Sequence, residues 1–441
     1  MTDDSTSLDR DLDDVTSGEG WQPKLLDLWK ALYDSRILER YDLSREWSYV
    51  EANPQMTLSS HIKDRYPLTD GEIDKVLRLT RFLVEGDLSK EERTLLSFNL
   101  VPLLEHYLDS GETRFLEYLC DLIPGEAREN HSWRAPPEKA SIELTNSCNL
   151  NCVMCGVGAK GFDQSRTMSL SLFREIIQKL GPNLKCARLN GLGESTIIPN
   201  FTDYLDTLDG TSVKLELVTN LSCDDEKLLE RLLGRDILIF VSCDSTKAEK
   251  MVRIRRGLNI DIFMRNLKSI SSYVRSNRRD KMDCQIIMTL MEHNFRELPE
   301  MVEFAWQYDF GGVIGNMVKD DNGSWKVELT EEIIETFREA ARKAENRGIA
   351  LKVPDQIEGI PLDEDFVSTS NATHCPTMME EVFIRYNGDV CPCNMMNPYV
   401  YGNLARSQIA RVINSVSARV FYALSNTDLR HPYCLSCYYM R

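Results

Sequence analysis

The 441-residue chain has no long uninterrupted run of apolar residues. Its first residues, MTDDSTSLDRDLDD, are acidic and polar, whereas a secretion signal begins with basic residues followed by apolar ones. No stretch reaches the roughly 20 apolar residues that a membrane-spanning helix needs. The sequence therefore predicts a cytoplasmic protein without a membrane partner.

Basic residues are also too few to balance the acidic ones. The chain has 52 Lys and Arg against 69 Asp and Glu, which gives a formal net charge of −17 at pH 7. A negative field of this size repels phosphate backbones. Nucleic acid is therefore excluded as an expected partner.

Histidine is scarce, with six residues, whereas cysteine is abundant, with 13. The odd number and the expected reducing compartment both argue against a disulfide framework. Metal ligation is then the leading interpretation of the clustered cysteines. An isolated one such as Cys120, within the apolar segment FLEYLCDLI, is better explained as a buried core thiol.

Composition and periodicity divide the chain into four segments. Residues 1–20 predict a disordered acidic tail. Residues 21–135 predict an all-helical N-terminal domain, because apolar residues recur three and four positions apart. Residues 140–354 alternate short apolar strands with amphipathic helices, and residues 355–441 predict a small α+β domain with a hairpin at EVFIRYNGDVCPC.

The segment 140–354 predicts an α/β fold, a partial (β/α)6 barrel. Six strands are expected at SIELTN, CARLNG, KLELVTN, ILIFVSCD, CQIIMTL and GVIGNMV. Strands that alternate with crossover helices form a parallel sheet. Active sites of such barrels lie at the carboxyl ends of the strands, and a cysteine cluster follows the first strand directly.

That cluster, in ELTNSCNLNCVMCGVG, contains Cys148, Cys152 and Cys155 within eight residues. A structural zinc ion needs four ligands, and no histidine lies nearby to complete the set. Three thiolates suit a [4Fe–4S] cluster whose fourth iron stays open to a non-protein ligand. An open iron at the mouth of a barrel favours catalysis over a structural role.

The CxxxCxxC spacing after the first strand resembles the radical S-adenosylmethionine (SAM) superfamily, and the resemblance extends from Ala140 to the C-terminus. It implies that SAM chelates the open iron of a catalytic [4Fe–4S] cluster. Reductive cleavage of SAM then gives a 5′-deoxyadenosyl radical, which takes a hydrogen atom from the substrate. A flavodoxin- or ferredoxin-type protein is the implied reductant. The sequence departs from the family at Val153, where an aromatic residue is common, and at Leu192, which interrupts a Gly-Gly pair.

The resemblance also implies a set of SAM contacts. NGLGEST is similar to the family's Gly-Gly-Glu segment, and the ends of the third and fourth strands with IRRGLNIDIFMRNL occupy the places of further contacts. The implied cofactor-binding residues are Gly191, Gly193, Glu194, Thr219, Asn220, Ser242, Asp244 and Arg255.

The C-terminal cysteines resemble auxiliary-cluster domains of the SPASM and twitch type. Five cysteines are too few for two all-cysteine clusters, so one auxiliary [4Fe–4S] cluster is expected. Cys391 and Cys393 are two apart on a strand and share a face, so either could ligate. The preferred ligands are Cys375, Cys393, Cys434 and Cys437, and a zinc site on the same thiols is the alternative.

An auxiliary cluster with four protein ligands favours electron transfer over substrate binding. The first expectation is a radical SAM oxidoreductase that dehydrogenates a polar small molecule such as an aminocyclitol or sugar. One alternative is an epimerase with Cys391 or Cys243 as hydrogen donor. Others are an enzyme that modifies a ribosomally made peptide and, from another class, a partner-binding scaffold with structural clusters.

Overall fold

The computed structural model describes most of the chain from residue 88 onward. The described residues are 69, 71–72, 75, 79, 82, 88–122, 134–158, 165–276, 280–318, 327, 330–354, 356–357, 360–361, 375, 380–394, 399–425 and 427–435. The predicted acidic tail and the predicted helices before residue 69 lie outside them. Two compact units are present. In one, described residues up to Ala135 pack with Asp389–Leu435, and in the other Pro136–Gly388 pack together.

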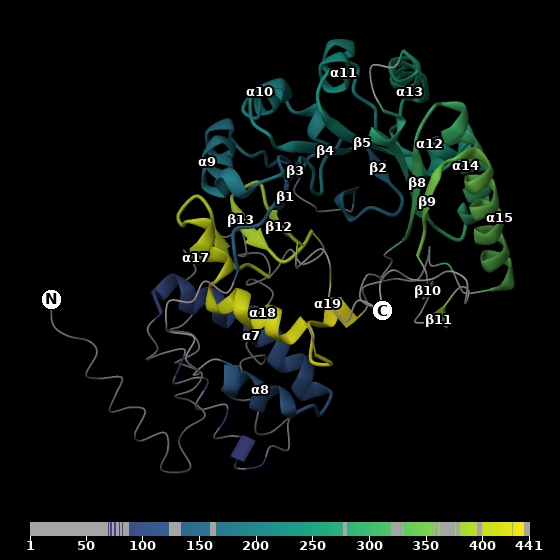
Figure 1. Cartoon of the computed structure of the whole chain (residues 1–441). Coiled ribbons are helices and arrows are strands. Elements are labelled where there is room, and N and C mark those ends of the chain that lie inside the picture. The colour runs from purple at the N-terminus through teal and green to yellow at the C-terminus, as the bar shows by residue number, and fades with distance from the viewer. Residues whose placement is uncertain are drawn as a thin grey trace. The chain divides into compact units, whose positions relative to one another are not determined.

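The larger unit contains a parallel sheet of eight strands, which curves into an arc with the helices on its outer side (Figure 1). This confirms the predicted α/β fold. The strands follow the order β12 (Glu381–Ile384), β1 (Lys139–Ile142), β3 (Cys186–Arg188), β4 (Lys214–Thr219), β5 (Ile237–Ser242), β7 (Cys284–Leu290), β8 (Gly312–Met317) and β9 (Ala350–Lys352).

Six of these strands match the expected ones, and one further parallel strand lies on each side of these six. β12 pairs in parallel with β1, with Lys139 opposite Glu381, and β9 pairs in parallel with β8. The first of these segments agrees with a strand of the predicted hairpin at EVFIRYNGDVCPC, whereas the second was not predicted as a strand. A strand of three residues gives little periodicity to read.

The outer helices begin and end at recognisable caps. They are α9 (Leu170–Leu180), α10 (Phe201–Asp206), α11 (Glu226–Leu233), α12 (Ala248–Ile254), α13 (Ile260–Arg275), α14 (Leu298–Gln307) and α15 (Glu331–Arg347). For α15, the Thr330 side chain accepts a hydrogen bond from Ile333 N, and Gly348 ends the helix with φ 61°.

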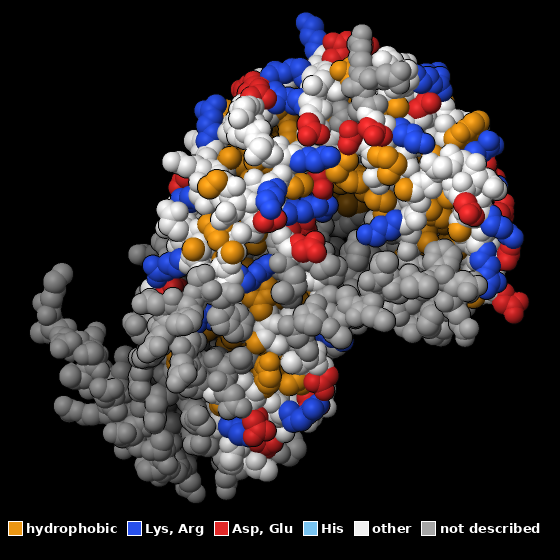
Figure 2. Space-filling view, viewed as in Figure 1, with side chains coloured by type: hydrophobic (Ala, Val, Ile, Leu, Met, Phe, Trp, Pro, Cys, Tyr) orange, Lys and Arg blue, Asp and Glu red, His pale blue; other side chains and the backbone are white. Residues whose placement is uncertain are grey.

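Burial alternates along the strands. In β5 and β7 every second residue, facing the helices, is buried, while those between keep intermediate exposure. A closed barrel has a packed interior, and parallel strands covered on both faces are buried throughout. The inner face of this arc is therefore partly open to solvent. Figure 2 shows hydrophobic side chains reaching the surface inside the arc, where this face is hollowed.

The smaller unit joins two segments that are distant in sequence. Its elements are α7 (Lys90–Asp109), α8 (Arg114–Leu122), β13 (Asp389–Cys391), β14 (Gly402–Asn403), α17 (Ile409–Ile413), α18 (Val416–Ser425) and α19 (Pro432–Leu435). Ser89 and Glu92 form a reciprocal capping box at the start of α7. Buried Asn99 donates to Val400 O at 2.8 Å and to Ser417 Oγ at 3.1 Å. Segments assigned from the sequence to N-terminal and C-terminal domains thus pack into one unit.

Candidate active site

Cys148, Cys152 and Cys155 lie on the loop that follows β1. A short antiparallel pair holds this loop, formed by β2 (Asn151–Cys152) and β6 (Arg255–Arg256). Val153 N adds a hydrogen bond to Ile254 O at 2.9 Å. Cys148 and Cys152 are half-buried, whereas Cys155 is exposed. The backbone of this loop is therefore fixed, and one thiol faces solvent.

One backbone and one side-chain N–H group contact the thiol of Cys148. Among the described residues, no three His, Cys, Asp or Glu side chains are grouped to hold one ion. Thiolates that ligate different irons of a [4Fe–4S] cluster do not need to meet at one point. Cys148 Sγ accepts from Leu150 N at 3.5 Å and from Asn220 Nδ2 at 3.9 Å. Burial raises the pKa of Cys152 to about 11, so without a metal this thiol is protonated at neutral pH.

The segment with Gly191, Gly193 and Glu194 lies against the chain that leads to Cys148. Gly193 N donates to Thr145 O at 3.2 Å, and Glu194 N donates to Ser147 O at 2.8 Å. A Cβ on residue 193 would lie 2.4 Å from Ser147 O. This position requires glycine because two backbones approach each other there.

The Glu194 carboxylate is buried and is held by several donors. Thr219 Oγ1 and Thr196 Oγ1 donate to Oε1, at 2.9 and 2.6 Å, and Asn220 N donates to Oε2 at 2.7 Å. Burial raises the pKa of Glu194, and these hydrogen bonds oppose the rise. The side-chain Nδ2 of Asn220 donates to Asn149 Oδ1 at 3.0 Å, and Asn149 belongs to the cysteine loop. The ends of β3 and β4 thus fix each other and the cysteine loop.

Asp244 and Arg255 form a buried ion pair, with Nε 2.8 Å from Oδ2. Neither of these two atoms has another hydrogen-bond partner among the described residues. Arg255 Nη1 also lies 4.0 Å from Cys152 Sγ. Thr289 N fixes Asp244 by donating to Oδ1 at 2.7 Å.

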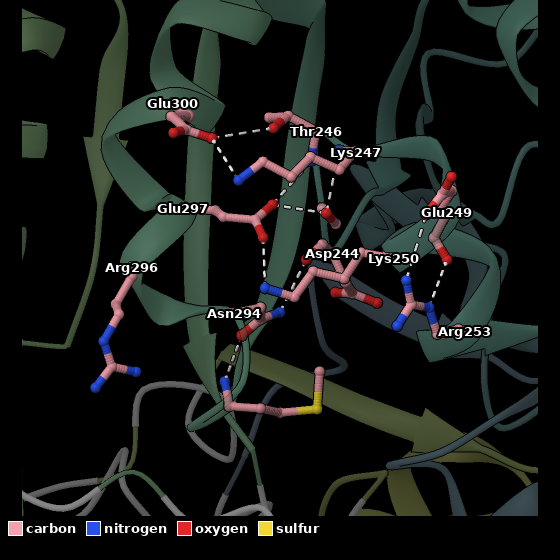
Figure 3. A network of polar contacts seen from close by, with 12 residues as sticks. Asp244, Thr246, Lys247, Glu249, Lys250, Arg253, Asn294, Arg296, Glu297 and Glu300 are labelled. Carbon is pink, nitrogen blue, oxygen red and sulfur yellow. Dashed lines mark hydrogen bonds and ion pairs between the residues drawn. The ribbon is translucent and has the colours of Figure 1, made fainter.

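The loop after Asp244 is held from the neighbouring strand and helix (Figure 3). Asn294 Nδ2 donates to Asp244 O and to Thr289 O, both at 2.9 Å. Buried Glu297 accepts from Ser245 Oγ at 2.6 Å and pairs with Lys250. This network orients Asp244 although none of its other members is among the predicted contacts.

At the end of β5, the neighbouring residues Ser242 and Cys243 point to opposite faces of the sheet. Ser242, a predicted SAM contact, has intermediate exposure, as do the inner-face residues of this strand. Cys243 points to the opposite face, is fully buried and donates to Ser245 O at 3.4 Å. Cys243 therefore does not face the open inner side, where a hydrogen donor for a substrate radical would have to lie.

The C-terminal cysteines are described in part. Cys391, at the end of β13, is 0% exposed, whereas Cys393 is half-buried. Cys375 and Cys434 are also half-buried, and Cys437 lies outside the described residues. The ligand set, with Cys393 preferred over Cys391, stays a prediction.

These residues fit the two groups that the sequence predicts. Cys148, Cys152 and Cys155 would hold the cluster, with N–H groups directed at the thiol of Cys148. Around them, Asn190 Oδ1 is buried without a described hydrogen-bond partner, and Asp244 Oδ2 and Arg255 Nε have only each other. Buried polar atoms normally have partners, so a polar ligand such as SAM suits this place.

Comparison with family models agrees with this chemistry. Residues 142–305 match the radical SAM superfamily, and residues 375–438 match the SPASM model, an iron–sulfur cluster-binding domain. The chain is a radical SAM protein with a C-terminal SPASM domain, and these two domains use SAM, a catalytic [4Fe–4S] cluster and an auxiliary cluster.

The chain is also similar to individual known proteins. The tungsten-containing aldehyde ferredoxin oxidoreductase cofactor-modifying protein of Pyrococcus furiosus is 22% identical over 324 residues, 67% of this chain and 86% of that protein. The subtilosin biosynthesis protein AlbA of Bacillus subtilis is 24% identical over 300 residues, 63% of this chain and 60% of AlbA. Streptococcus suis SuiB bound to S-adenosylmethionine superposes with a TM-score of 0.53 at 14% identity, covering 85% of this chain and 87% of SuiB. A second structure shows SuiB bound to its precursor peptide SuiA.

Sequence reasoning missed several residues of the site. Thr196, Asn149, Asn294 and Glu297 take part through side-chain hydrogen bonds that depend on the folded chain. Glu143 gave a signal, because it is a charged residue inside the apolar strand segment SIELTN. A buried carboxylate in such a place requires a partner.

Proposed function

We propose that this chain is a radical SAM enzyme that modifies a peptide. The observation that carries this proposal is the open inner face of the sheet. Inner-facing residues of β5, β7 and β8 keep intermediate exposure, so a segment of another chain can lie along them. The names of AlbA and of the SuiB–SuiA complex support a peptide as the substrate class.

Each part of the site has a task in this reaction. When bound, the cluster and SAM supply a carbon-centred radical that removes a hydrogen atom from an unreactive C–H group. Cys148, Cys152 and Cys155 hold the cluster at the carboxyl ends of the strands. The donors around Glu194 and the pair Asp244–Arg255 keep the strand ends in place.

The predicted dehydrogenation of a polar small molecule is the second candidate. Charged side chains on the strands of this sheet favour it. Glu216 accepts from Lys139 Nζ at 3.0 Å and from Arg188 Nε at 2.8 Å, and Glu381 lies 3.7 Å from Arg188 Nη1. These charges neutralise one another, so they give this candidate weaker support than the open inner face gives to a peptide. The epimerase alternative loses support because its expected donors, Cys391 and Cys243, are both fully buried.

A flavodoxin- or ferredoxin-type reductant stays part of the proposal, as does a cytoplasmic location. No helix among the described residues is long and apolar enough to cross a bilayer.

Activity-guided fractionation tests the substrate class. Reduced holoenzyme and SAM are incubated anaerobically with either a peptide fraction or a small-metabolite fraction from cells that contain this chain, and 5′-deoxyadenosine is measured. The proposal predicts stimulation by the peptide fraction and loss of that stimulation after protease treatment. Protease-resistant stimulation by the metabolite fraction would identify the second candidate instead. Absence of 5′-deoxyadenosine under all conditions would favour the scaffold.

A further inference from the structure

Glu143 is a buried carboxylate at the start of the active-site loop. It follows β1 directly, its backbone N–H donates to Ile384 O at 2.8 Å, and the residue is 1% exposed. Its burial raises its pKa, and backbone donors together with Arg385 oppose the rise. Because burying a carboxylate costs free energy, its neighbours must compensate for it. With so little exposure, Glu143 does not contact a substrate on the open inner face.

The partner of Glu143 is the glycine segment of the active site. Leu192 N donates to Glu143 Oε2 at 2.9 Å. The next two amides, of Gly193 and Glu194, donate to backbone oxygens of residues 145 and 147. Three consecutive N–H groups thus face the chain from residue 143 to 147. Of the three acceptors, only the one for Leu192 N belongs to a side chain, the Glu143 carboxylate.

Gly191 and Glu143 also fit each other sterically. A Cβ on residue 191 would lie 2.5 Å from Glu143 Cβ and Cγ and 2.6 Å from Oε2. The Glu143 side chain therefore occupies the space that a side chain at position 191 would need. This contact explains why position 191 is glycine, although Leu192 interrupts the Gly-Gly pair that is common in the family.

The direction of the three amides determines that of the carbonyl groups. In a trans peptide the N–H and C=O of one unit point in opposite directions. The carbonyl oxygens of residues 191–193 therefore point away from the 143–147 chain, and no described residue donates a hydrogen bond to them. Carbonyl oxygens can accept from an ammonium group, which has three N–H donors and no acceptor, and the resemblance to the radical SAM family implies that this segment lies along the amino group of SAM.

We propose that Glu143 is a positioning residue for SAM: it holds the Leu192 amide and thereby directs the carbonyl oxygens of residues 191–193 toward the ammonium group of SAM. The proposal rests on the assignment of SAM to this site and is independent of the substrate class.

SAM binding to the reduced holoenzyme tests this role without any substrate. The EPR signal of the cluster is titrated with SAM in wild type, Glu143→Leu and Glu143→Gln, and iron content and thermal unfolding are measured for each. Glu143→Leu is expected to keep its iron and to bind SAM about tenfold more weakly, the scale of one lost hydrogen bond to a charged group. Glu143→Gln keeps an acceptor oxygen and should stay within about threefold of wild type.

A carboxylate away from the site provides the control. Glu138 is exposed and pairs with Lys185, so Glu138→Gln should bind SAM as wild type does. Wild-type binding by Glu143→Leu would overturn the proposal. Equal weakening by Glu143→Gln would also overturn it, since charge and not the acceptor would then matter.

Gly191→Ala keeps the test decisive if Glu143→Leu fails to fold. The added methyl displaces the same contact from the other side, so SAM binding should weaken while the three cysteines still hold iron. Wild-type SAM affinity in Gly191→Ala would contradict the proposal.

Discussion

The two cysteine-bearing regions of the chain differ in how their ligands are brought together. Cys148, Cys152 and Cys155 lie on one short loop, which is held by the pairing of β2 with β6. The C-terminal cysteines are distributed from residue 375 to residue 437. A set that is local in sequence can be recognised from spacing alone, whereas a distributed set depends on how the whole domain folds.

The largest effect is expected from removal of the local set. Replacing Cys148, Cys152 and Cys155 by Ala should abolish SAM cleavage and leave only the iron of the auxiliary cluster. Anaerobic iron and sulfide analysis and the yield of 5′-deoxyadenosine measure both effects. The control is Cys223→Ser, a half-buried thiol outside both sets. Unchanged iron in the triple variant would show that Cys148, Cys152 and Cys155 do not hold a cluster.

A second effect concerns the C-terminal cysteines, of which either Cys391 or Cys393 could be the ligand. Cys393→Ala should lose the auxiliary iron, about half of the total in a protein with two [4Fe–4S] clusters. Cys391→Ala should keep it, because the resemblance to auxiliary-cluster domains favours Cys393 as the ligand. EPR of the reduced variants distinguishes the two clusters. The opposite pattern would make Cys391 the ligand, and zinc in place of iron would identify the alternative site.

A smaller effect is expected from crowding the backbone beside the local set. In Gly193→Ala the new Cβ would lie 2.4 Å from Ser147 O and 2.5 Å from Thr145 O, so one of the two chains must move. SAM binding should weaken by more than about tenfold, since a shift of this kind displaces the neighbouring carbonyl oxygens. Gly71→Ala is the control, because nothing lies within 4 Å of its Cβ position. Equal SAM affinity in both variants would show that the close approach is not needed.

The smallest effect concerns the unit that contains β13. Asn99→Ala removes a buried amide that bonds Val400 and Ser417, and it leaves their polar atoms without that partner. Unfolding of this unit should be easier by about 1–3 kcal/mol. Thermal unfolding measures the loss, and the exposed Asn183→Ala provides a control. SAM binding should not change, since the SAM site lies in the other unit.

Much of the fold was readable from the sequence, because six strands carry clear apolar runs between amphipathic helices. The edge strand β9 was not, since three residues carry too little periodicity, whereas β12 was predicted as a strand of the hairpin at EVFIRYNGDVCPC. The segment from Ile409 to Ser425 forms two helices, α17 and α18, with Asn414 and Ser415 between them. Ser415 Oγ accepts there from Ala418 N, in the manner of an N-terminal cap.

The sequence by itself determined the chemistry, because the spacing of three cysteines specifies an iron–sulfur cluster with an open position. It also determined the parallel sheet, through the alternation of strands and helices. Only the tertiary structure decided which side chains support that chemistry. Glu143 meets Leu192, and Glu194 meets Thr219, because parallel strands bring their carboxyl ends together at one edge of the sheet. Hydrogen bonds between residues so far apart in sequence leave no periodic pattern in the chain.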